Sequence, residues 1–122
     1  MAQKIAIMED EELILNLLEK KLTKEGYELL IARNGEEGLK LIKEKTPDLL
    51  LLDIIMPLKG GFEVLEEMQQ DATLKNVPVI IISNSGQPVE IDRAQKLGAK
   101  DWLIKTDFDP QEVVDKIKKQ IG

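Results

Sequence analysis

Hydrophobic and polar positions alternate along the chain in blocks whose spacing switches between that of strands and that of helices. Five short, nearly unbroken apolar runs are predicted to form β-strands, at residues 4–8, 27–32, 49–52, 77–82 and 101–104. Between these runs and after the last one, apolar residues recur every three or four positions, which is typical of amphipathic helices. The pattern therefore predicts five strands and five helices in strict alternation.

The predicted helices are marked by their ends as well as by their apolar residues. Gly26 is expected to end the first helix and Gly98 the fourth, since glycine is common just after a helix. Asp109 and Pro110 are expected to cap and begin the last helix. The residues expected to form the apolar stripe of the first helix are Leu13, Ile14, Leu17, Leu18 and Leu22.

This alternation, with short connections, indicates one doubly wound α/β domain. Strands joined by helices form a parallel sheet with helices on both faces. The run Leu49–Leu52 is apolar at every position, as expected of a central strand that is covered above and below. No repeat, linker or low-complexity segment interrupts the pattern. We therefore expect a single domain over residues 1–122, without an output domain.

Composition excludes several classes of function. The chain contains neither cysteine nor histidine, so a metal ion would take oxygen ligands. The formal net charge of −6 disfavours direct nucleic-acid binding, which needs clustered lysine and arginine. No apolar run approaches the roughly 20 residues of a membrane span, and no secretory signal is recognisable at the start. The expected location is cytoplasmic, with no membrane partner.

Polar side chains follow four of the five predicted strands. Glu9 and Asp10 follow the first strand, Asp53 the third, Ser83 the fourth and Lys105 the fifth. In a doubly wound sheet these strand ends share one edge, where ligands bind. Three carboxylates there would repel one another without a cation, and Mg²⁺ prefers such oxygen ligands. With a hydroxyl and an ammonium group beside them, the edge could hold a phosphoryl group on a carboxylate.

Taken together, these motifs make the chain resemble the receiver domains of two-component response regulators, over about residues 3–121. The matching pieces are Glu9-Asp10, Asp53-Ile54-Ile55-Met56-Pro57 with Gly61, Ser83, and Gly98 to Lys105. The resemblance implies a flavodoxin-like fold with strand order 2-1-3-4-5.

The resemblance also implies the roles of several residues. Asp53 would be the phosphoacceptor, and Lys105 would pair with the phosphoryl group. Glu9, Asp10, Asp53 and the backbone carbonyl of Ile55 would bind Mg²⁺. The donor would be a histidine kinase or a phosphotransfer protein, and the output an unidentified downstream protein. The domain would be a switch rather than an enzyme, limited to self-catalysed phosphoryl transfer and weak autodephosphorylation; a homodimer formed on phosphorylation stays open.

The same resemblance makes Ser83 and Trp102 the switch pair that reports phosphorylation. Asn84 departs from the family pattern, because a small residue usually stands beside the phosphoryl site. This departure bears on crowding at the site and on the lifetime of the phosphoryl group.

Thr106 is a second departure, because the family usually has a proline after the lysine, with a cis peptide bond. A cis bond costs about 0.5 to 1 kcal/mol before proline but roughly 3 to 4 kcal/mol before other residues. We therefore predict a trans Lys105–Thr106 bond, with Thr106 and Asp107 rearranged so that Lys105 still reaches Asp53.

The same residues are open to other interpretations. A flavodoxin-like cofactor module would need phosphate-binding amides in the first loop, where Met8 to Glu11 would repel phosphate. A Mg²⁺-dependent phosphohydrolase would carry a second aspartate at the position of Ile55. The acidic run Glu9–Glu12 could also simply complement a helix dipole. A receiver-like interaction scaffold that is never phosphorylated stays open as the main alternative.

Overall fold

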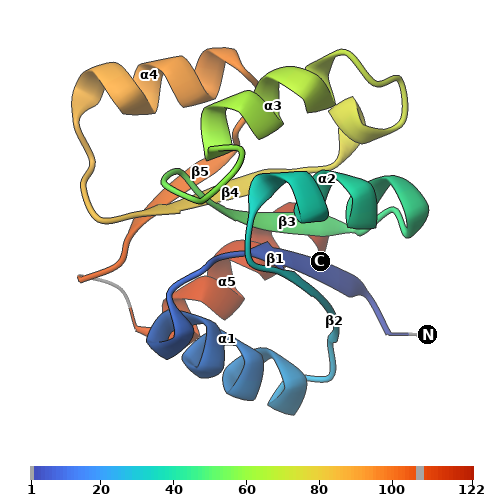
Figure 1. Cartoon of the computed structure of the whole chain (residues 1–122). Helices are drawn as coiled ribbons and strands as arrows, with labels where there is room; N and C mark the ends of the chain where they lie inside the picture. Colours follow the sequence, from blue (N-terminus) through green and yellow to red (C-terminus); the bar gives the residue numbers. More distant parts are fainter. Residues whose placement is uncertain (1, 107–108) are drawn as a thin grey trace.

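A computed structural model of the chain describes residues 2–106 and 109–122, and its strands form one parallel sheet (Figure 1). The strands are β1 (Lys4–Met8), β2 (Glu28–Ala32), β3 (Leu49–Asp53), β4 (Val79–Ser83) and β5 (Asp101–Ile104). Their order in the sheet is β2-β1-β3-β4-β5, and every neighbouring pair is parallel. The doubly wound, flavodoxin-like prediction is confirmed.

Five α-helices cover the two faces of this sheet. They are α1 (Glu12–Lys24), α2 (Gly35–Glu44), α3 (Gly61–Gln69), α4 (Pro88–Lys96) and α5 (Pro110–Ile121), and a short 3₁₀ helix spans Leu74–Asn76. Helices α1 and α5 lie on one face, and α2, α3 and α4 lie on the other (Figure 1). The predicted cap of α5 is present, because the Asp109 side chain accepts a hydrogen bond from the Glu112 amide.

The four leucines of strand β3 lie at the centre of both hydrophobic cores. Successive strand side chains point to opposite faces, so Leu49 and Leu51 pack with α1 and α5, whereas Leu50 and Leu52 pack under α2 and α3. All four are fully buried. Each buried leucine stabilises the fold by about 1.5 to 3 kcal/mol relative to an exposed one, which explains the unbroken apolar run.

The predicted apolar stripe of α1 was wrong at two positions. Leu13 is 80% exposed and Leu17 is 43% exposed, whereas Leu15, Leu18 and Leu22 are buried against the sheet. Successive helical residues are rotated by about 100°, which sets Leu13 and Leu17 roughly opposite Leu15. The helix therefore buries one of its two apolar faces and exposes the other.

Strand β4 also differs from its prediction, because it begins at Val79 rather than at Val77. The residues before it form the 3₁₀ helix Leu74–Asn76, and Pro78 has no N–H to donate to a strand ladder. Its last residue is Ser83.

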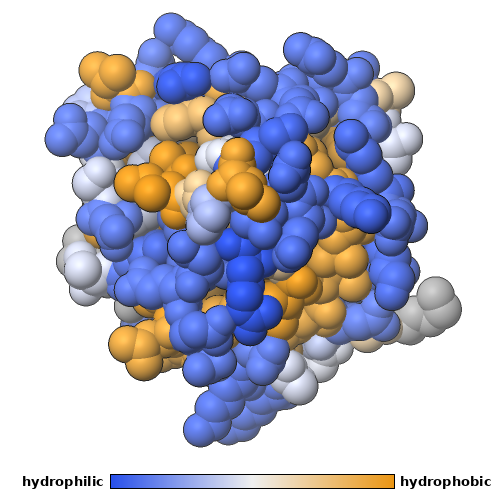
Figure 2. Space-filling model, in the orientation of Figure 1, coloured by the Kyte–Doolittle hydropathy of each residue, from blue (hydrophilic) through white to orange (hydrophobic). Residues whose placement is uncertain are grey.

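Hydrophilic residues cover most of the face shown in Figure 2, and apolar residues are exposed there in separate patches. Within residues 2–106 and 109–122, no helix is both long and apolar enough to cross a membrane.

Candidate functional site

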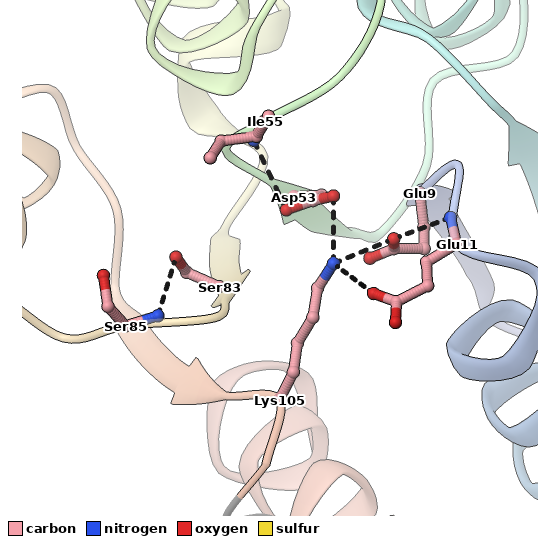
Figure 3. A network of polar contacts seen from close by, with 7 residues as sticks. All are labelled: Glu9, Glu11, Asp53, Ile55, Ser83, Ser85 and Lys105. Carbon is pink, nitrogen blue, oxygen red and sulfur yellow. Dashed lines mark hydrogen bonds and ion pairs between the residues drawn. The ribbon is translucent and has the colours of Figure 1, made fainter.

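Strand ends bring four functional side chains to one edge of the sheet (Figure 3). Glu9 directly follows β1 and Lys105 directly follows β5, while Asp53 and Ser83 are the last residues of β3 and β4. The Lys105 amide donates to the Ser83 carbonyl oxygen at 2.7 Å, so strand-like pairing continues to the edge. The common edge predicted from the sequence is therefore present.

The Lys105 ammonium is the centre of this site. Its Nζ atom lies 3.0 Å from Glu9 Oε1, 3.0 Å from Glu11 Oε2 and 3.1 Å from Asp53 Oδ2. The lysine side chain is only 5% exposed. Burial acts to lower its pKa, but hydrogen bonds to the three carboxylates outweigh burial and hold the pKa above its usual range. Lys105 is therefore a fixed positive charge and not a surface lysine.

Glu9 carries an unsatisfied oxygen into the same site. Its Oε1 atom accepts from Lys105 and from the Glu11 amide, at 2.9 Å, whereas its buried Oε2 atom has no hydrogen-bond partner among the described residues. Burial, and then the charge of Asp53, raise the pKa of Glu9 to about 7. Burial also raises the pKa of Asp53, against the opposing effect of Lys105. The positive charge of Lys105 is therefore not enough to offset the burial of these two carboxylates and their mutual repulsion.

Asp10 completes a cluster of three carboxylates. One oxygen each from Glu9, Asp10 and Asp53 lie within 4.8 Å of one another, and Asp10 is exposed while the other two are buried. An oxygen-rich cluster with a free, buried lone pair suits a hard divalent cation such as Mg²⁺. The three carboxylates predicted to bind such an ion are therefore brought together, and they fit it.

The loop after β3 is packed tightly against the site. The Ile55 amide donates to Asp53 Oδ1 at 3.4 Å, and Ile55 is 76% exposed. A Cβ atom on Gly61 would collide with the Asp53 carbonyl oxygen and would lie 2.8 Å from the Ile54 Cα atom. Glycine at this position therefore allows α3 to begin directly against the end of β3.

Ser83 and Trp102 are joined through the backbone of Ser85. The Ser85 amide donates to Ser83 Oγ at 3.4 Å, and the Trp102 indole Nε1–H donates to the Ser85 carbonyl oxygen at 2.9 Å. The half-buried indole borders a hollow of about 140 Å³ beneath α4, lined by Ile91 and Ala94 among others. Sequence reasoning missed this link, because a backbone contact leaves no signature in side-chain identity.

Two further findings concern residues flagged in the sequence. No cis peptide bond occurs in the described part of the chain, so the Lys105–Thr106 bond is trans, as predicted, and Lys105 still reaches Asp53. Asp107, the other residue of that prediction, lies outside the described residues. Asn84 is exposed. Sequence reasoning also missed the contact of Glu11 with Lys105, because it gave Glu11 no role other than that of an acidic residue at a helix start.

The doubly wound sheet, with acidic residues at β1 and β3 and a lysine after β5, defines a receiver-type α/β domain. The chain belongs to the response regulator receiver domain family, and the model of that family matches residues 5–118. This family serves two-component signalling, and its domains are signalling domains rather than conventional enzymes.

Individual relatives agree with this assignment. The chain is 33% identical over 118 residues to the alkaline phosphatase synthesis transcriptional regulatory protein PhoP of Bacillus subtilis, covering 97% of this chain and 48% of PhoP. A crystal structure of a response regulator from Chloroflexus aurantiacus is 29% identical, with a TM-score of 0.92 and coverage of 99% and 98%. The phosphorylated cyanobacterial phytochrome response regulator RcpA is 28% identical, with a TM-score of 0.86 and coverage of 99% and 94%. The chain spans about half the length of the curated relatives it matches.

Proposed function

We propose that this chain is the phosphoacceptor switch of a two-component phosphorelay and that Asp53 accepts the phosphoryl group. The observation that carries the proposal is the contact of Asp53 with Lys105 at 3.1 Å, made between two buried side chains at the ligand-binding edge of the sheet. A carboxylate held against a permanent cation can bear a further negative group. The phosphorylated state of the related RcpA structure supports this interpretation.

In the proposed reaction, a carboxylate oxygen of Asp53 attacks the phosphorus of a phosphohistidine on a kinase or phosphotransfer protein. The new O–P bond forms as the N–P bond breaks, and the histidine nitrogen keeps the electron pair. Lys105 then exchanges its contact with Asp53 Oδ2 for the phosphoryl oxygens, and the Ser83 hydroxyl donates to another of them. Positioning and charge supply the catalysis, since the chain contains no histidine to act as a general base.

Glu9, Asp10 and Asp53, with the backbone carbonyl of Ile55, would hold Mg²⁺. The bound ion would offset the negative charge that develops on the transferring phosphoryl group. The unpartnered Glu9 Oε2 atom is the feature that supports these ligands, because a cation would satisfy it.

The proposed switch runs from Ser83 to Trp102 through Ser85. When Ser83 Oγ turns to the phosphoryl group, the Ser85 amide loses its acceptor and the loop that holds the indole N–H is released. The hollow beneath α4 gives the ring room to move. Trp102 fluorescence should therefore change when beryllofluoride, a phosphoryl mimic, binds with Mg²⁺. No change, with the mimic shown bound by ¹⁹F NMR, would remove Trp102 from the switch.

The decisive test is labelling with acetyl phosphate and Mg²⁺, followed by intact-mass measurement. We expect a phosphoryl adduct on the wild type that is lost in Asp53→Asn and when EDTA removes the metal. Asp92→Asn is a matched control, because Asp92 lies on exposed α4 and pairs with Lys96. An adduct of equal yield on Asp53→Asn would disprove the assignment, and no adduct on the wild type would favour the unphosphorylated scaffold.

Phosphorylation by a histidine kinase or a phosphotransfer protein, action on a downstream protein, the single-domain organisation and the cytoplasmic location stay predictions. Formation of a homodimer on phosphorylation is likewise untested, and sedimentation with and without beryllofluoride would detect it.

A further inference from the structure

Glu11 is the third carboxylate that binds Lys105, and it is not one of the proposed metal ligands. Lys105 contacts one oxygen each of Glu9 and Asp53, both proposed Mg²⁺ ligands, so the incoming ion and the ammonium would share the same two carboxylates. Mg²⁺ and the Lys105 ammonium, bound to the same carboxylates, would also repel each other. Among the contacts of the Lys105 ammonium within the described part of the chain, the one with Glu11, at 3.0 Å, involves no proposed metal ligand.

The Glu11 side chain interacts with the candidate site and does not cap helix α1. Glu11 is the N-cap residue of α1, and its side chain makes no capping hydrogen bond. A capping side chain normally accepts from an amide of the first turn. The Glu11 carboxylate instead binds Lys105, while its own amide donates to Glu9 Oε1 at 2.9 Å. One residue thus holds both the lysine and a proposed metal ligand.

We propose that Glu11 is a positioning residue that keeps the Lys105 ammonium at the site while Mg²⁺ takes Glu9 and Asp53. This inference rests on the proposed function. Glu11 is 48% exposed, so its carboxylate remains partly hydrated and can hold the ammonium without closing the metal cluster. Without Glu11, the remaining contacts of the Lys105 ammonium within the described residues are with the two proposed metal ligands, so Mg²⁺ would share both of these carboxylates with the ammonium.

Calorimetric titration of the whole chain with MgCl₂ tests this inference directly. In Glu11→Gln we expect the Mg²⁺ dissociation constant to rise about fivefold, as befits one partly exposed ion pair. Glu11→Asp, which restores the charge, should recover part of the affinity. Glu12→Gln is the matched control, because the exposed Glu12 pairs with Arg33 and loses the same charge. Labelling by acetyl phosphate should show a higher Mg²⁺ requirement in Glu11→Gln but a nearly normal rate at saturating Mg²⁺.

A double-mutant cycle separates positioning from simple loss of charge. In a Lys105→Met background, Glu11→Gln should weaken Mg²⁺ binding no more than Glu12→Gln does, because no ammonium remains to be held. An equal fivefold loss in that background, or an unchanged affinity in Glu11→Gln alone, would overturn the inference and leave the phosphoacceptor proposal intact. Failure of the wild type to bind Mg²⁺ would overturn the proposed metal site itself, and the inference with it.

Discussion

The interior of the central strands and their carboxyl ends follow opposite rules, although they are consecutive in sequence. Leu49 to Leu52 are fully buried, and their apolar side chains need no partner beyond close packing. The next residue, Asp53, is almost as deeply buried but carries a charge that depends on Lys105. One end of the strand is built for stability, and the other accepts an electrostatic cost that a ligand could relieve. The following measurements are designed to test this contrast.

The largest effect is expected in the strand interior. Leu51→Ala should lower the free energy of unfolding by about 2 to 5 kcal/mol, because it removes a fully buried side chain and leaves a cavity. Leu13→Ala is a matched control: Leu13 is 80% exposed, so a change within about 0.5 kcal/mol is expected. Urea denaturation of both variants makes the measurement. Equal losses would mean that the exposed face of α1 is packed in solution.

The next largest effect on the free energy of unfolding is expected at the carboxyl ends of the strands, and it depends on pH. The pKa of Glu9 is raised from 4.5 to about 7, so the folded protein holds this proton more tightly than the unfolded chain. Its stabilising contribution is therefore present at low pH and is lost as the pH rises through 7. Without metal, the free energy of unfolding should fall by about 2 to 3 kcal/mol between pH 5 and pH 8.

Two comparisons isolate this pH effect. Glu9→Gln should flatten the profile measured in EDTA, and saturating Mg²⁺ should restore stability to the wild type at pH 8, because the ion binds the folded state alone. A profile that stays as steep in Glu9→Gln would assign the titration to other groups.

The smallest effect is expected at the link between Trp102 and Ser85. Trp102→Phe removes the indole N–H and keeps an aromatic ring, so the free energy of unfolding should fall by about 1 kcal/mol. Ser85→Ala is the matched control, since it leaves the accepting backbone carbonyl in place. Thermal denaturation of the two variants compares them, and a larger loss in Ser85→Ala would show that the backbone link matters little.

The same contrast explains what the sequence could and could not predict. An unbroken apolar run such as Leu49–Leu52 indicates a central strand of a parallel sheet, so the fold was predictable. The carboxyl ends of such strands share one edge, so the grouping of Glu9, Asp53 and Lys105 was predictable as well. The buried face of α1 was not, because apolar residues occupy two of its faces and tertiary packing selects between them. Glu11 was missed because acidic residues at helix starts are common for another reason, the helix dipole.

Gly61 has a consequence for how mutational libraries of this chain should be interpreted. Any side chain there meets the Asp53 backbone, so most substitutions at Gly61 should be depleted in a functional selection as strongly as those at Asp53 itself. A fitness map alone would thus assign chemical importance to a residue that has no side chain. Scoring abundance and signalling separately would distinguish the two positions, because Asp53→Asn should accumulate normally whereas bulky variants of Gly61 should not.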